Sequence, residues 1–212
     1  MVHKNKYSFS FTGASALLAE TIIIAQEYLR LQDWEKVKVS VQENNLMNKT
    51  KQNTSKRMYH ELKKRLELLT NEQLDLIVNG SPDESKAMVL LSLLKAYSFF
   101  NDFVIEVIRR KYLLYNNVLI ESDYTSFFNA KALTNSELNA ITAKTTNKVK
   151  QVLFKMLEQV GLINSAKEGM IIKPFLSDDC IKVILQEDAS LFAGFLYSDA
   201  EIKSIKKNLV HG

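Results

Sequence analysis

The chain is poor in the residues that build sheets and covalent frameworks. Its 212 residues include six Gly, two Pro and one Cys. Tight turns depend on Gly and Pro, so a sandwich or barrel is disfavoured. A single Cys excludes a disulfide framework and a Cys-based zinc cluster. The composition therefore predicts a mostly all-α globule.

Long apolar runs are also missing. The longest, residues 87–100, is interrupted by Lys95, and a bilayer span needs about 20 apolar residues. The N-terminus has no apolar stretch typical of a signal peptide. We expect a cytoplasmic protein with no membrane contact, and a monomer.

Signatures of catalysis are absent from the sequence. It has no Gly-rich phosphate loop, no Gly-x-Ser-x-Gly elbow and no His-Glu-x-x-His. The acids Asp178 and Asp179 are typical of a helix start, and Cys180 is expected in the core. The three histidines are isolated from one another: His3, His60 and His211. We therefore expect no enzyme, no metal site and no cofactor.

Basic residues gather in two islands on an otherwise acidic chain. The net charge is +4, whereas residues 49–65 carry +6 and residues 144–155 carry +4, which leaves −6 elsewhere. Such islands indicate a polyanionic partner. The alternative is two solvated helix faces. The basic members of the first island are Lys49, Lys51, Lys56, Arg57, Lys63, Lys64 and Arg65.

Apolar spacing and capping residues predict helices along the first half. Asp33 and Thr54 are expected N-caps, and capping boxes begin at Thr70 and Ser81. The helices are expected at 14–31, 34–43, 55–69, 71–80 and 82–114, the last with a kink near 97–101, and a loop is expected at 44–53.

Aromatic residues in this half are expected in the core. Tyr7, Phe9 and Phe11 alternate with serines, which predicts an extended arm packed across the helices. Tyr97, Phe99, Phe100 and Phe103 are likewise expected in the core.

The last third has the element order of a winged helix-turn-helix. Helices are expected at 122–133, 135–141 and 145–160, the second with a capping box from Thr134 to Glu137. After Gly161, residues 162–172 read as a small β-hairpin, followed by helices at 178–186 and 200–209. In this motif a short helix supports a long one whose outer face enters the DNA major groove.

The expected recognition helix carries a basic outer face. Its side chains are Lys144, Lys148, Gln151 and Lys155, with Thr145, Thr146 and Asn147 at the N-terminal end. Asn and Gln can bind adenine, and Lys can bind guanine or phosphate. The alternative is a winged helix that contacts another protein.

Residues 33–69 predict a second, less regular helix-turn-helix unit. The residues that its helix carries away from the apolar stripe are Lys56, Arg57, His60, Lys63 and Lys64, and the loop before it adds Lys49 and Lys51. We expect DNA contacts from Lys51, Lys56, Arg57 and Lys64.

Several segments resemble the BrxA family of BREX bacteriophage-exclusion systems. They are 7–12 (YSFSFT), 55–57 (SKR) leading to Arg65 and Leu66, 79–82 (NGSP), 101–107 (NDFVIEV) and 151–157 (QVLFKML). They occur in family order and cover most of the chain.

The resemblance implies an all-helical protein with two helix-turn-helix units that binds double-stranded DNA. It also implies a place in a defence system that methylates host DNA and blocks phage replication, in which BrxA is not the methyltransferase. Family members are also described as inner-membrane proteins, which the hydropathy contradicts, and have been likened to a helical RNA-binding antitermination factor.

The sequence thus predicts a non-catalytic, double-stranded DNA-binding protein of a BREX system, with other BREX proteins as possible partners. We expect an N-terminal region at 1–118 and a C-terminal winged-helix region at 119–212, packed as one globule. The alternatives are a protein–protein adaptor in the same system and an RNA-binding protein.

Overall fold

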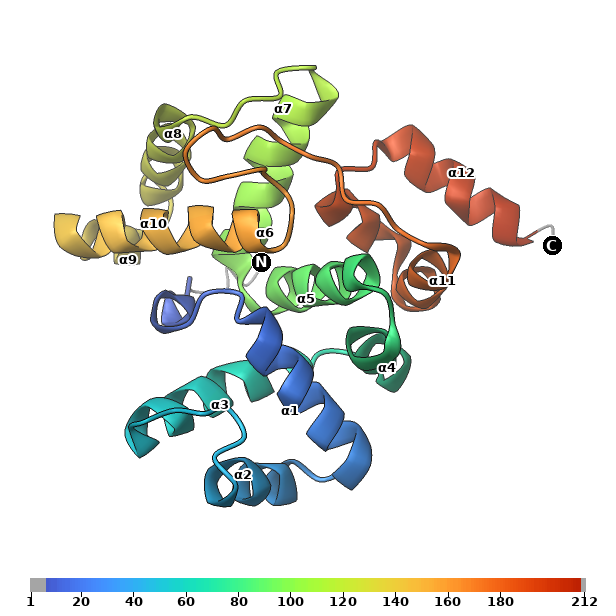
Figure 1. Ribbon diagram of the computed structural model, residues 1–212. Coiled ribbons are helices and arrows are strands. Elements are labelled where there is room, and N and C mark those ends of the chain that lie inside the picture. The colour runs from blue at the N-terminus through green and yellow to red at the C-terminus, as the bar shows by residue number, and fades with distance from the viewer. Residues whose placement is uncertain (1–6, 211–212) are drawn as a thin grey trace.

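The computed structural model describes residues 7–210, with the backbone alone for 208–210, and is dominated by helices. Figure 1 shows α1 to α3 below the central α5, the α6 to α10 group above it, and α11 and α12 to the right. The helices are α1 (Leu18–Leu31), α2 (Trp34–Glu43), α3 (Gln52–Leu66), α4 (Asn71–Asn79), α5 (Pro82–Ala96), α6 (Ser98–Phe103), the π-helix η2 (Val104–Arg109), α7 (Arg110–Leu113), α8 (Glu121–Ala132), α9 (Ser136–Asn139), α10 (Ala143–Gln159), α11 (Asp178–Glu187) and α12 (Asp199–Val210), with the 3₁₀ turns η1 (Ser10–Gly13) and η3 (Ala189–Phe195).

Side-chain caps confirm most of the predicted helix starts. Asp33 accepts hydrogen bonds from the amides of Glu35 and Lys36 at the start of α2. Complete capping boxes begin α4 at Thr70 and α5 at Ser81. These contacts use amides that a helix end otherwise leaves unpaired.

Three predicted starts are wrong. Helix α1 begins at Leu18, after Leu17 in the left-handed conformation, rather than at Ala14. Helix α3 begins at Gln52, so Thr54 is not its cap; extended Lys51 precedes it, without a side-chain cap. The capping box at Thr134 is also wrong, because α9 follows Asn135 with no side-chain cap. The Glu137 carboxylate instead accepts a hydrogen bond from the Tyr7 amide at 3.4 Å.

The long helix expected at 82–114 is broken rather than kinked. Tyr97 has extended backbone between α5 and α6, and the two helical stretches meet at 110°. The Tyr97 hydroxyl accepts a 2.7 Å hydrogen bond from Arg65 Nε and donates to the Glu61 carboxylate. These tertiary contacts hold the break in a sequence that has neither Pro nor Gly there.

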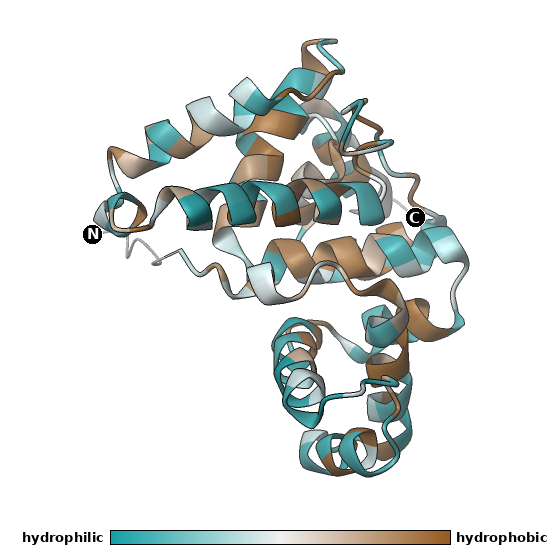
Figure 2. Ribbon diagram, turned by 60° about the vertical axis from the view of Figure 1, so that its left-hand side comes forward, coloured by the Kyte–Doolittle hydropathy of each residue, from teal (hydrophilic) through white to brown (hydrophobic). Residues whose placement is uncertain are grey.

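One hydrophobic core joins the two halves. Helix α5 is buried on nearly all sides, and Tyr97, Phe99, Phe100 and Phe103 are all buried, as predicted. The Phe99 ring lies 5.3–6.5 Å from three aromatic rings of α8. In Figure 2 the hydrophobic turns gather where the helices meet, and hydrophilic turns face outward.

The N-terminal arm packs across this core, as predicted, and turns into η1 at Ser10. The rings of Tyr7 and Phe9 make edge contacts with Phe99 at 5.2 and 5.0 Å. The Tyr7 hydroxyl donates to Asp102 at 2.7 Å. Burial first, and then the Asp102 carboxylate, raise the pKa of Tyr7 to about 12.

Between residues 7 and 210, no single helix has both the length and the apolar character to cross a bilayer. The α5 stretch and the Ser98–Leu113 stretch reach that length and composition only as a pair bent by 110°.

Candidate nucleic-acid interface

Helix α10 separates an apolar face from a polar one. Its N-cap Thr142 accepts a hydrogen bond from the Thr145 amide at 3.2 Å. The inner face is buried as predicted, through Val149, Val152, Leu153, Met156 and Leu157. The spacing of this stripe turns the intervening polar residues outward.

The outer face of α10 consists of free polar side chains. Thr145 and Glu158 are exposed on α10, and the Glu158 carboxylate accepts a hydrogen bond from the Ala166 amide at 3.2 Å. The other exposed polar residues are Lys144, Asn147, Lys148, Gln151 and Lys155. Their side chains make no hydrogen bond or ion pair with any other part of the chain that the structure describes. A lysine without an acidic partner in the fold is available to neutralise a phosphate.

The two threonines of the candidate site are held at the start of the helix. The Thr145 hydroxyl lies 3.1 Å from that of Thr142, and the Thr146 hydroxyl donates to the Thr142 carbonyl at 3.3 Å. The Tyr124 hydroxyl donates to the Thr146 carbonyl at 3.2 Å. These contacts fix the N-terminal turn of α10 against α8.

One basic residue of this island is not free. Lys150 Nζ lies 3.0 Å from the Glu121 carboxylate and is largely shielded from solvent. This ion pair joins α10 to the first turn of α8. Lys150 therefore belongs to the scaffold rather than to the outer face.

Short extended segments lie beside α10. Val118 forms an antiparallel bridge with Met170, and Ile163 forms another with Ile171. The segment 169–171 therefore runs between 117–119 and 162–164. In the described residues these pairings are isolated bridges, shorter than the predicted hairpin.

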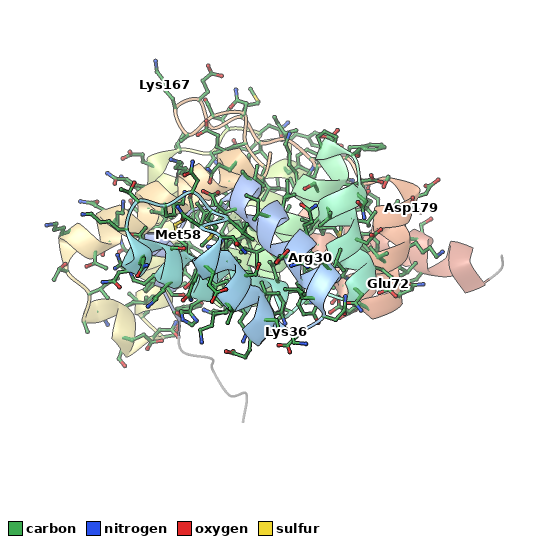
Figure 3. All side chains as sticks on the ribbon, turned by 60° about the horizontal axis from the view of Figure 1, so that its bottom comes forward. Arg30, Lys36, Met58, Glu72, Lys167 and Asp179 are labelled. Carbon is green, nitrogen blue, oxygen red and sulfur yellow. The ribbon has the colours of Figure 1, made fainter. Side chains whose placement is uncertain are left out.

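A glycine fixes the approach of these segments. Gly169 has φ +69°, and a Cβ built on it would lie 2.1 Å from the Leu119 carbonyl oxygen. Only Gly fits both conditions. The turn at 164–169 also carries Lys167, which no motif of the sequence marks as a ligand contact; Figure 3 shows it projecting away from the body. Its place in a turn beside the basic helix was the available signal.

The first basic island is used differently. Lys49 Nζ lies 2.8 Å from the Glu20 carboxylate. Lys63 Nζ lies 3.5 Å from Glu67 on its own helix and 3.6 Å from a carboxylate on α2. Both ammonium groups are therefore engaged within the fold.

Two further members of this island hold the N-terminal segment. Lys64 donates to Ser10 at 3.1 Å and lies over the Tyr97 ring. Arg65 is fully buried and donates to the carbonyls of residues 14–16 at 2.7–3.2 Å. Arg65 is thus a structural residue, and Lys64, a predicted DNA contact, is already bonded.

The remaining three basic side chains of the island stay exposed. Lys51, Lys56 and Arg57 make no ion pair with the residues that the structure describes. They lie at and just after the start of α3. The α3 region therefore has three free cations, whereas its sequence contains seven basic residues.

No group of three or more His, Cys, Asp or Glu side chains is arranged to hold a metal within the described part of the chain. His60 is exposed, and His3 and His211 lie outside the described residues. Cys180 is buried, as expected, and burial raises the pKa of its thiol. Asp178 and Asp179 lie in the first turn of α11.

Two comparisons with known proteins point to one family, and a third shows a similar fold. The BrxA family model matches residues 5–188. A relative from Bacillus cereus (strain H3081.97), described as "BREX protein BrxA", is 29% identical over 121 residues, which span 57% of this chain and 60% of the relative. A crystal structure of an uncharacterized protein from Magnetospirillum magneticum has a similar fold, with a TM-score of 0.79 and 18% identity, over 90% of this chain and 98% of that one.

Proposed function

The chain belongs to the BrxA family, and we propose that it is a non-catalytic component of a BREX phage-defence system that binds double-stranded DNA largely through phosphate contacts. The observation that carries the proposal is the outer face of α10. Three exposed lysines, Lys144, Lys148 and Lys155, lie on it without an acidic partner in the described chain.

The spacing of these lysines suits a nucleic-acid backbone. Residues 144, 148, 151 and 155 recur every three or four positions, so they follow one side of the helix. Asn147 and Gln151, on the same exposed face, could bind base edges. With three lysines against two amides, we expect sequence-independent contacts to supply most of the affinity.

The surroundings of α10 support a winged helix-turn-helix reading. The short helix α9 precedes α10, and the paired segments 117–119, 169–171 and 162–164 follow the strand pairing of a small wing. Lys167 at its turn would reach a phosphate beside the groove that α10 enters. Lys51, Lys56 and Arg57 would supply a second, weaker contact.

A mobility-shift titration with double-stranded DNA, single-stranded DNA and RNA tests this proposal. We expect the tightest binding to the duplex, with little dependence on its sequence. Binding to RNA alone would instead favour the RNA-binding alternative, and no binding at low salt would reject the proposal.

A second candidate function is that of a protein–protein adaptor in the same system. Exposed apolar side chains on the paired segments favour it: Val118, Ile120, Met170 and Ile172 are each 40–52% exposed. Residues two apart in an extended segment share a face. The replacements Met170→Ser and Ile172→Ser should leave duplex binding unchanged, whereas an adaptor would lose its partner protein.

A further inference from the structure

A polar pocket lies where α2 ends and α3 begins. Its volume is about 490 Å³, and it is lined from α2, from the connecting turn and from the first residues of α3. Its lining includes Gln42, Glu43, Lys49, Ser55 and Lys56. None of them belongs to the α10 face.

Ser55 places an unused hydroxyl in this pocket. The residue is 5% exposed, and its Oγ has no hydrogen-bond partner among the residues that the structure describes. A serine inside a helix commonly donates to the carbonyl four residues earlier. A buried hydroxyl without a partner is costly, which indicates a ligand-binding position.

A second buried donor meets the same pocket. Gln42 Nε2 is shielded from solvent and also has no partner within the described chain. An amide nitrogen can only donate a hydrogen bond. Gln42 lines this pocket and also a neighbouring one beside the end of α1. The lining of the pocket thus includes one buried hydroxyl from α3 and one buried NH₂ group from α2.

The start of α3 adds backbone donors. Lys51 is the N-cap in extended conformation, and no side chain caps the helix. The first amides of a helix have no carbonyl within the helix to bind. The positive end of the α3 dipole therefore lies beside unpaired backbone amides and the pocket. This arrangement of a helix N-terminus binds phosphate groups in many proteins.

The charges around the pocket leave a cation excess. Lys56 is exposed, and the Lys49 ammonium is shared with Glu20 at 2.8 Å. Exposed Lys51 directly precedes the helix. One acid, Glu43, lines the pocket and opposes these charges. Donors and cations together favour a compact anion.

We propose that this pocket is a phosphate-binding site, with the Ser55 hydroxyl, the Gln42 amide and the first amides of α3 as donors. The phosphate comes either from the backbone of duplex DNA or from a free phosphate compound. The first source rests on the proposed DNA-binding function, whereas the site itself does not.

An NMR titration of the full chain with inorganic phosphate at constant ionic strength, with chloride as the reference salt, tests the site. We expect saturable shifts of the backbone amides of Gln52 and Asn53, because the amides of Thr54 and Ser55 already donate to the Lys51 carbonyl. Ser55→Ala should weaken phosphate binding by about tenfold, the effect of one hydrogen bond to a charged group. Its melting temperature should not fall, since the lost hydroxyl has no partner in the fold.

A matched pair of lysine variants separates this site from general charge. Lys56→Gln should weaken phosphate binding, whereas Lys36→Gln, on the exposed first turn of α2, should not. Figure 3 shows Lys36 well apart from Met58 of α3. Equal phosphate binding by the parent and Ser55→Ala, or shifts that do not saturate, would overturn the site.

A duplex titration then identifies the source of the phosphate. Shifts of the same amides by DNA, reduced when inorganic phosphate is present, support a DNA phosphate. Shifts by phosphate but not by DNA support a free phosphate compound. A parent protein that binds phosphate but no duplex would reject the proposed DNA function and leave this site standing.

Discussion

The two basic regions differ in what their charges do. In the α10 region, Lys144, Lys148 and Lys155 are exposed and unpaired within the described chain, and Lys150 alone is engaged. In the α3 region, four of the seven basic residues are bonded within the fold. One of them, Arg65, is fully buried. The region with the greater sequence charge thus offers no more free cations than the other.

This difference shows that a count of basic residues does not measure a binding surface. The charge of a lysine bonded to a carboxylate is already neutralised within the fold. A buried arginine cannot contact a ligand at the surface. The number of free cations on one face decides how many phosphates can be neutralised. By that measure the two regions are equal, with three free cations each. Helix α10 is the primary candidate because Lys144, Lys148 and Lys155 follow one side of the helix.

The largest expected effect concerns stability and lies in the α3 region. Arg65→Met removes the donor to three backbone carbonyls and to Tyr97, all of them buried or nearly so. We expect it to lower the free energy of unfolding by about 3–5 kcal/mol. Chemical denaturation measures this change.

The matched control is Arg57→Met on the same helix. Because Arg57 is exposed and unpaired in the described chain, we expect a change within about 0.5 kcal/mol. Equal destabilisation by the two variants would contradict the division between structural and free basic residues.

The next effect concerns binding by α10. Lys148→Glu with Lys155→Glu should weaken duplex binding at least about tenfold at moderate salt, because two phosphate contacts are lost and two repulsions are added. Both residues lie off the apolar stripe, so the stability cost should stay within about 1 kcal/mol. Fluorescence anisotropy and thermal melting measure the two quantities. A folded variant that binds as tightly as the parent would remove α10 from the interface.

A smaller effect is expected from the α3 region. Lys56→Glu with Arg57→Glu reverses the same number of charges on an equally exposed surface. We expect duplex binding to fall by less than it does for the α10 pair, by about threefold at the same salt. If this pair has the larger effect, the ranking of the two regions is reversed.

The smallest effect is expected within α10 itself. Lys150→Gln removes a cation from the same helix, but one that is bonded to Glu121 at 3.0 Å. We expect duplex affinity to change by less than about twofold, since the charge was already paired. An effect equal to that of Lys148→Gln would show that pairing does not set which lysines bind.

Much of the fold could be predicted because its signals are local. The apolar stripe of α10, the Asp33 cap and the boxes at Thr70 and Ser81 each lie within a few residues. The break at Tyr97 was expected only as a kink, because it depends on Arg65, 32 residues away in sequence.

The candidate site was predictable only in part, for the same reason. The outer face of α10 follows from helical spacing alone. The ion pairs that engage Lys49 and Lys150 join residues 29 apart, so sequence spacing cannot reveal them. The sequence places Arg65 in the basic island and Lys64 among the DNA contacts, whereas in the structure Arg65 lies in the core and Lys64 is bonded to Ser10. Tertiary contacts decided otherwise.

The salt dependence of duplex affinity tests the central claim most directly. With about five phosphate contacts, the slope of log K against log salt should lie near −4 to −5 for the parent. For the Lys148→Glu, Lys155→Glu variant it should be shallower by about two, one for each lost contact. A parent slope near zero, or the same slope in both proteins, would contradict DNA binding through the free lysines of α10.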